Sequence, residues 1–140
     1  MRKYYIIFII ALFLAIGLIG YFNVKSQKAK PLADLNADNI KSIIIKTQIL
    51  EDSPQEKIIT DNEDIREVIE YFSKLKYKEQ KGQVDENGWQ FWLIFDGWDK
   101  NITYQGNYVI VGGVRYEVKS KSSEEFMKIY KSLKSSTNDN

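Results

Sequence analysis

The fold is decided by the stretch ITYQGNYVIVGGVRYEV, which covers residues 102–118. Two glycine-containing pairs, Gly106-Asn107 and Gly112-Gly113, interrupt its apolar residues and suit the tight turns of β-hairpins. In residues 114–118 apolar side chains alternate with charged ones, which is typical of a strand with one face in water. The stretch therefore predicts three consecutive antiparallel strands, at residues 102–105, 108–111 and 114–118.

Another strand is predicted just before this meander, from Trp89 to Phe95. Both of its alternating faces carry apolar side chains, which favours a central position in the sheet. The turn Asp96-Gly97 then leads into the meander. We expect one face to carry Trp89, Phe91, Leu93 and Phe95, and the other to carry Gln90, Trp92 and Ile94.

Two shorter strands are predicted earlier in the chain. Residues 40–50 are rich in β-branched side chains, and residues 57–60 follow the turn Glu51-Asp52-Ser53-Pro54. A helix then begins at the capping box Thr60-Asp61-Asn62-Glu63, with Thr60 as the expected cap. The apolar stripe of this helix consists of Ile65, Val68, Ile69, Phe72 and Leu75. Residues 77–88 are a polar stretch, to which no strand or helix is assigned.

A second capping box, Ser122-Ser123-Glu124-Glu125, predicts a final helix. Its apolar side is formed by Phe126, Ile129, Tyr130 and Leu133. The predicted fold class is therefore α+β: an antiparallel sheet of about five strands with two helices packed on one face, in the order ββαβββ(β)α. We assign the domain to residues 40–134 and a disordered tail to residues 135–140.

The amino-terminal segment from Tyr4 to Val24 is almost entirely apolar. As a helix it would be about 30 Å long, the hydrocarbon thickness of a bilayer, so residues 1–24 are predicted to be an uncleaved signal-anchor transmembrane helix. A cleavable signal has a shorter apolar region followed by a small-x-small site. The short leader with Arg2 and Lys3 favours a single-pass protein of the cell membrane whose carboxyl-terminal domain is extracytoplasmic.

Residues 25–39 are polar and are interpreted as a linker. Within them Asp34, Asn36 and Asp38 have the spacing of the first ligands of a calcium loop. Asn39 stands where such a loop has its turn glycine, and Ile45 stands where it has its bidentate glutamate. We therefore expect no metal here, and no cofactor elsewhere.

Composition excludes several classes of function. The chain has no histidine and no cysteine, so imidazole-based catalysis, disulfides and thiolate metal sites are absent. Residues 1–30 contain five basic residues and no acidic one, so their net charge is +5. Because the whole chain has a net charge of +1, residues 31–140 have a net charge of −4. The domain thus lacks the basic surface of a nucleic-acid-binding protein, and no nucleic acid is expected as a partner.

Three stretches together resemble a known type of protein. They are the Ile40-Lys41-Ser42-Ile43-Ile44-Ile45 strand, the Thr60-Asp61-Asn62-Glu63-Asp64-Ile65 helix start and residues 112–118, combined with a basic leader and an apolar amino terminus. The chain resembles small membrane-anchored or lipoprotein-like extracytoplasmic proteins of Gram-positive bacteria, of the domain-of-unknown-function type. The resemblance covers residues 40–134 and implies no catalytic residue. It also implies a sensing role as one possibility.

The aromatic residues of the meander are the leading candidates for a binding site, because exposed aromatic side chains mark partner and ligand surfaces. The alternative is that they fill the core. The candidate ligand- or partner-binding residues are Trp92, Asp96, Trp98, Asp99 and Tyr104.

Three functions are compatible with these observations. We expect no enzymatic activity and favour a membrane-anchored, extracytoplasmic binding or accessory module, attached through Tyr4 to Val24. Its partner would be a membrane or cell-envelope protein, a peptide or a wall polymer. The second reading is a cell-wall glycan hydrolase that uses a carboxylate pair, Asp96 and Asp99, or Glu86. The third is a structural or sensor subunit of a membrane complex.

Overall fold

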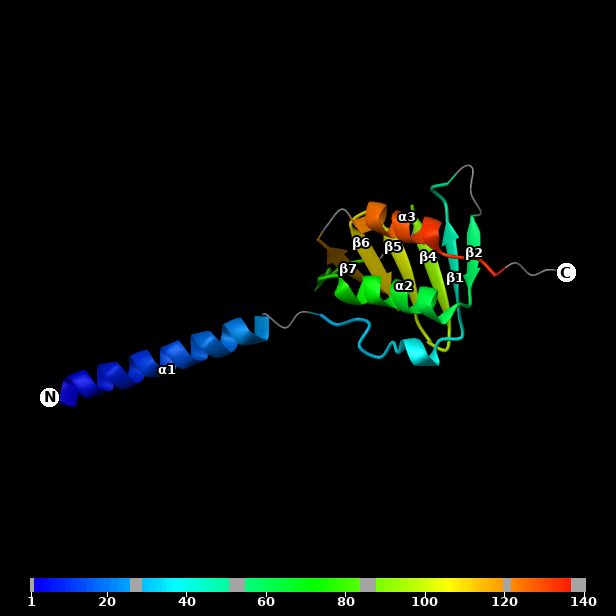
Figure 1. Ribbon diagram of the computed structural model, residues 1–140. Coiled ribbons are helices and arrows are strands. Elements are labelled where there is room, and N and C mark those ends of the chain that lie inside the picture. Colours follow the sequence, from blue (N-terminus) through cyan, green and yellow to red (C-terminus); the bar gives the residue numbers. More distant parts are fainter. Residues whose placement is uncertain (1, 26–28, 51–54, 84–87, 120–121, 137–140) are drawn as a thin grey trace.

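The computed structural model describes residues 2–25, 29–50, 55–83, 88–119 and 122–136 (Figure 1). Its helices are α1 (Arg2–Lys25), the short 3-10 helix η1 (Ala37–Asn39), α2 (Asn62–Lys74) and α3 (Ser122–Ser132). Its strands are β1 (Ser42–Thr47), β2 (Glu56–Ile59), β3 (Tyr77–Glu79), β4 (Phe91–Asp96), β5 (Asn101–Gln105), β6 (Tyr108–Val111) and β7 (Val114–Val118).

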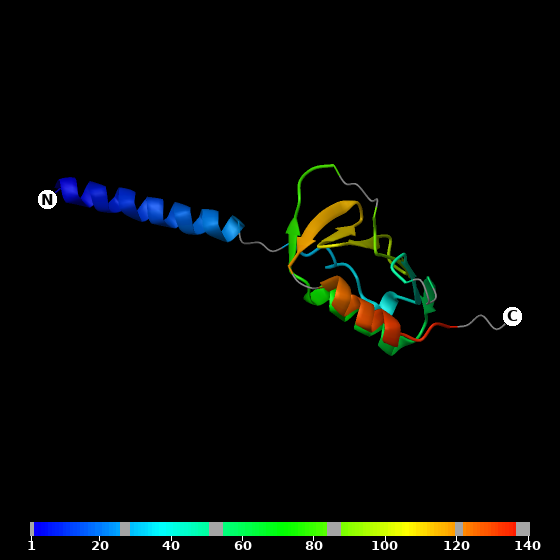
Figure 2. The same ribbon diagram turned by 90° about the horizontal axis from the view of Figure 1, so that it is seen from above.

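All seven strands form one sheet, in the order β2-β1-β4-β5-β6-β7-β3. Every neighbouring pair is antiparallel. Helices α2 and α3 lie side by side on one face of this sheet, as Figures 1 and 2 show from two directions. The opposite face is covered by no helix of the described residues, and we call it the open face. The α+β class and the placement of both helices agree with the sequence analysis.

The predicted strand count and order are wrong. The sheet has seven strands rather than about five. Six of them lie at the segments expected to form strands, and the seventh is β3, within the polar residues 77–88. β3 pairs with β7, placing Tyr77 opposite Val118. Only Tyr77 of its three residues is buried. A three-residue edge strand with one buried side chain has too short an apolar alternation to be recognised.

The prediction of a transmembrane helix is also corrected by the structure. Residues 2–25 do form a helix, α1, and its described side chains, in residues 6–18, are exposed. Among the residues that the structure describes, however, no helix combines the length and the apolar character that crossing a bilayer requires.

The core lies between the sheet and the two helices. Along β4 the buried residues Phe91, Leu93 and Phe95 face the helices, and the intervening residues are half-buried or exposed on the open face. β4 lies between β1 and β5, so its predicted central position is confirmed. The helix-facing side chains pack against the apolar stripe of α2, formed by Ile65, Val68, Ile69 and Phe72, and against Phe126, Tyr130 and Leu133 of the α3 region.

The start of α2 differs from the expectation by one residue. The cap is Asp61 rather than Thr60, and its carboxylate accepts hydrogen bonds from the backbone N–H groups of Glu63 at 2.9 Å and Asp64 at 3.1 Å. A carboxylate at this position satisfies the free amides and suits the positive end of the helix dipole. Helix α3 begins at Ser122, the first residue of its predicted capping box, and the side chain of Ser122 is outside the described part of the structure.

Residues 29–40, most of which were interpreted as a linker, pack on the domain. Leu32 and Ile40 are buried in the core, with 8% and 4% of their surface exposed. Lys100 reaches Asp34 at 2.6 Å, and Arg66 reaches Asp38 at 2.8 Å. This segment is therefore held to α2 and to the β4–β5 turn by both apolar contacts and ion pairs.

Both edges of the sheet are partly paired by irregular chain segments. Ala29 forms an antiparallel bridge with Tyr77 of β3. At the other edge, the backbone N–H of Ser136 donates to the carbonyl of Ile58 in β2 at 2.8 Å. The Ile58 N–H donates to the Ser135 hydroxyl at 3.3 Å. Such coverage limits edge-to-edge association of sheets.

Candidate functional site on the open face of the sheet

A half-buried apolar stripe crosses three neighbouring strands on the open face. Ile44 of β1 lies directly opposite Ile58 of β2 on one side and Ile94 of β4 on the other. Directly opposed side chains in antiparallel strands are about 5 Å apart, so these three isoleucines form a continuous row. Two tryptophans extend it. The open-face stripe, as we call it, consists of Ile44, Ile58, Trp89, Trp92 and Ile94.

Trp92 is placed by strand alternation, because it lies between the helix-facing Phe91 and Leu93. Trp89 was expected on the side of Phe91, but β4 begins only at Phe91 and Trp89 precedes it. Its ring meets that of Trp92 edge to face, with centroids 6.2 Å apart. Both indoles are only half-buried, so each presents apolar surface to solvent. Aromatic side chains in this condition are frequent anchors of binding surfaces.

Charged side chains border the stripe. Lys46 of β1 lies opposite Trp92 of β4, and its amine is 5.6 Å from the centre of the Trp92 ring. The same amine is 3.4 Å from the carboxylate of Glu56, which lies across from it on β2. Both charged groups are largely in water, so the pair contributes little to stability. Apolar surface bordered by polar groups is the usual anatomy of a protein interface.

The five residues predicted for the site do not come together. Trp92 belongs to the open-face stripe. Tyr104 is fully buried on the opposite face, where its ring stacks with that of Phe126 at 6.4 Å. It therefore belongs to the core. The sequence shows that Tyr104 alternates with its neighbours, but it does not show which alternate face the helices cover.

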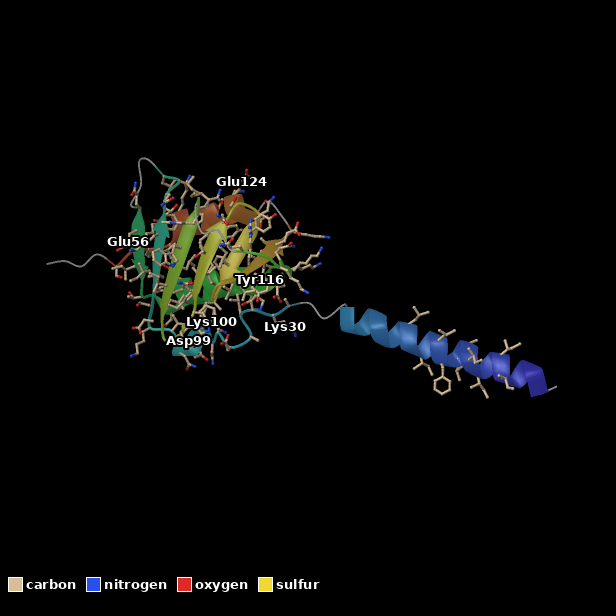
Figure 3. The ribbon with its side chains drawn as sticks, turned by 180° about the vertical axis from the view of Figure 1, so that it is seen from behind. Lys30, Glu56, Asp99, Lys100, Tyr116 and Glu124 are labelled. Carbon is tan, nitrogen blue, oxygen red and sulfur yellow. The ribbon has the colours of Figure 1, made fainter. Side chains whose placement is uncertain are left out.

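The remaining three predicted residues occupy the β4–β5 turn. Trp98 is half-buried and packs edge to face on the helix-facing ring of Phe95, with centroids 5.4 Å apart. Asp96 ends β4 and Asp99 follows Trp98, and both are exposed. In Figure 3, Asp99 and Lys100 lie together at one end of the sheet, and Glu56 lies at its β2 edge. Trp98 therefore packs against the core with part of its ring in water, and the two carboxylates are exposed.

This turn is packed against the chain beneath it. The N–H of Lys41 donates to the carbonyl of Asp96 at 2.9 Å. A Cβ added at Gly97 would lie in severe overlap with the carbonyl oxygen of Asn39. Asp96 and Asp99 therefore flank a turn that rests on residues 39–41. Glu86, the third carboxylate of the hydrolase reading, lies outside the described residues.

The three residues with calcium-loop spacing have structural partners. Asp34 pairs with Lys100, Asp38 pairs with Arg66, and the side-chain oxygen of Asn36 accepts from the N–H of Asp38 at 3.0 Å. The pKa of Asp34 is lowered, chiefly by its hydrogen bond from Lys100. Within the described part of the chain, no group of three or more carboxylates is placed to hold a metal ion.

A cavity of about 290 Å³ lies between the amino-terminal segment of the domain and the end of α2. None of the five predicted site residues lines it. Its walls are Ala29, Lys30, Pro31, Leu32, Ala33, Ser73, Leu75, Lys76 and Tyr77.

Comparisons with protein-family models, with characterised proteins and with solved structures found no match to this chain. The resemblance to small extracytoplasmic proteins of Gram-positive bacteria therefore stays a prediction. The site rests on the geometry of the open face alone.

Proposed function

We propose that the domain is a non-enzymatic binding or accessory module that contacts a polypeptide partner through the open-face stripe. The observation that carries this proposal is the unequal coverage of the sheet. Two helices bury one face, while Ile44, Ile94 and Trp92 of the other face stay half-exposed in neighbouring strands. Contiguous apolar surface of this kind is a mark of interaction sites on folded proteins.

The extent of the stripe supports a polypeptide rather than a small molecule as the partner. Its isoleucines lie in three neighbouring strands, and the charged side chains of Lys46 and Glu56 border it. Apolar surface with a charged rim is typical of protein interfaces. The backbone of Ile58 in edge strand β2 is already bonded to Ser135 and Ser136, so the partner is contacted by side chains of the face rather than by an added strand.

Cross-linking in cells tests the proposal. The full chain should yield a discrete adduct, and Trp92→Ala should weaken the interaction by roughly 30-fold, as expected for an aromatic anchor. Ile49→Ala is the matched control, because Ile49 is exposed but lies outside the stripe. Retained circular dichroism would show that Trp92→Ala is folded. Equal adduct yields from both variants would refute the assignment of the stripe.

The alternative function is that of a glycan hydrolase, and an activity assay on the same purified protein tests it. Release of reducing ends from cell-wall preparations, abolished by Asp96→Asn or Asp99→Asn, would replace the binding proposal with an enzymatic one.

Membrane association and an extracytoplasmic position of the domain stay predictions. Protease added to cells stripped of their wall tests the position, since an outward domain is digested without detergent.

A further inference from the structure

A second feature of the open face lies away from the stripe, on β6 and β7. Arg115 of β7 lies opposite Ile110 of β6. Its guanidinium is 3.8 Å from the centre of the Tyr108 ring. Stacking on an aromatic face restricts the rotamers of the arginine and keeps the planar group in one orientation. Arg115 is therefore held in place before any ligand arrives.

One donor of the Arg115 guanidinium is unused among the residues that the structure describes. Its Nε is buried and donates to no acceptor there. Among the residues that the structure describes, Arg115 also forms no ion pair. A buried N–H of a charged group without an acceptor is costly, and each such case in a folded protein calls for an explanation such as a bound ion.

A polar hollow lies beside this guanidinium. It has a volume of about 120 Å³, and its walls are Gln80, Lys81, Gly82, Gln83, Tyr108 and Arg115. These residues supply two cations, two amides and a phenol, and no carboxylate. The described residues 80–83, which follow β3, lie on the side of the sheet opposite to the helices (Figure 2).

The wall formed by Gln80 is fixed by two hydrogen bonds. Its backbone N–H donates to the carbonyl of Arg115 at 2.9 Å. Its side-chain amide donates to the carboxylate of Glu117 at 3.0 Å. Glu117, the nearest acidic residue along β7, is thus bonded to Gln80 and not to Arg115, and it lies opposite Lys78 in the strand register.

We propose that this hollow binds a small oxyanion, in the form of a carboxylate or a phosphate group. Arg115 supplies its guanidinium group, and Lys81 supplies a second positive charge. Charge-assisted bonds from guanidinium to carboxylate or phosphate are among the strongest hydrogen bonds that proteins make. The site is local, because residues 31–140 as a whole carry a net charge of −4. It is separate from the open-face stripe, so it does not depend on the proposed function.

Nuclear magnetic resonance of the full chain in a non-ionic detergent tests the site. Inorganic phosphate and acetate are added separately, and the Nε–H resonance of each arginine is followed. We expect a saturable shift of Arg115 and none of Arg66, which does not line the hollow. The probe that binds with the higher affinity shows whether the hollow prefers a phosphate or a carboxylate group. No saturable shift with either probe would overturn the proposal.

Variants give a second and independent readout. Arg115→Gln should weaken binding at least about tenfold, through the loss of a charge-assisted hydrogen bond, as monitored on the side-chain amides of Gln80 and Gln83. Lys81→Gln should weaken it less. Lys78→Gln is the matched control, because it removes one charge from the neighbouring strand without changing the hollow. Equal weakening by Lys78→Gln would indicate general electrostatic attraction and contradict a built site.

The sequence nearby requires one more variant. Asp85 and Glu86 follow in the same connection and lie outside the described residues. In an Asp85→Asn, Glu86→Gln double variant we expect unchanged affinity for the stronger probe. Binding that appears only in this variant would show that a carboxylate of the chain itself occupies the hollow, and it would overturn the proposal of an external ligand.

Discussion

The side-chain amine of Lys57 lies 2.6 Å from the carbonyl oxygen of Tyr130 and 4.7 Å from the centre of the Tyr130 ring. It also donates to the carbonyl of Leu133 at 2.9 Å. This buried lysine therefore joins edge strand β2 to the end of α3, where the last carbonyls of the helix need donors. Strand β2, which carries Ile58 of the open-face stripe, is thus held in place by hydrogen bonds on the helix-covered side of the sheet.

Replacing Lys57 should destabilise the domain. Lys57→Met keeps the aliphatic chain but leaves both carbonyls without their donor, so we expect a loss of about 1.5–3 kcal/mol in the free energy of unfolding. Chemical denaturation measures it. Lys46→Met is the control, because the exposed pair of Lys46 with Glu56 should contribute at most about 1 kcal/mol. Equal losses from the two variants would show that the bonds to α3 contribute nothing.

Alkaline pH should destabilise the fold through Tyr130. Burial raises the pKa of Tyr130 to about 12, from 10.0. The folded state then holds its proton more tightly than the unfolded state, so this stabilisation is complete below pH 10 and is lost as pH rises towards 12. At about 1.4 kcal/mol per pH unit, the loss reaches roughly 3 kcal/mol. Denaturation curves across this range should fall less steeply for Tyr130→Phe.

Lys57 should give the free energy of unfolding the opposite pH dependence, below pH 10.5. Burial lowers its pKa below 10.5, so the unfolded state binds its proton more tightly. Stability should therefore rise as pH increases from the folded-state pKa of Lys57 to 10.5. The rise should vanish in Lys57→Met. A rise of the same size in that variant would assign it to another group.

The β4–β5 turn should not tolerate a side chain at Gly97. Its φ is +112°, and an added Cβ would overlap the Asn39 carbonyl, so Gly97→Ala combines backbone strain with a steric clash. We expect a loss of more than about 2 kcal/mol in the free energy of unfolding. Gly106→Ala is the control, because its φ is +59° but nothing lies near the added atom. It should cost about 1 kcal/mol. Similar losses would exclude the contact with Asn39.

Acid should break the contact of Asp34 with the β4–β5 turn, while the buried Leu32 and Ile40 keep the segment on the domain. The hydrogen bond from Lys100 lowers the pKa of Asp34, so this ion pair is present above pH 3.8 and is lost as pH falls through the folded-state pKa. Trp98, close to this pair, reports the change by fluorescence, since the Lys100 amine is 5.6 Å from its ring. In Asp34→Asn the acid transition should disappear. Its persistence there would exclude the Asp34–Lys100 pair as its cause.

Much of the fold is predictable from local patterns. The stripe of Ile65, Val68, Ile69 and Phe72 identifies α2, and glycine pairs identify the two turns of the meander. Strand β3 was missed because its recognition depends on pairing with β7, some forty residues later in the chain. The placement of Tyr104 was missed for a related reason. Both faces of β4 are apolar, so only the position of the helices decides which aromatic residues are buried.

The two proposed sites differ in the same way. Trp92 was predicted because a tryptophan between two buried neighbours must lie on the other face of its strand. The row of Ile58, Ile44 and Ile94 requires the strand order β2-β1-β4, which alternation within single strands does not specify. Arg115 gave no signal at all, because its unused N–H is apparent only when the side chains around it are placed.

Site-specific photocross-linking tests the central claim most directly. A photoreactive residue is introduced at position 94, within the open-face stripe, or at position 114. The native Val114 is exposed, but it lies on the other face of the sheet, in line with the buried Tyr116 of β7. The protein is then irradiated in cells. The account predicts a discrete polypeptide adduct from position 94 and none from position 114. The same adducts from both positions, or none from position 94, would contradict it.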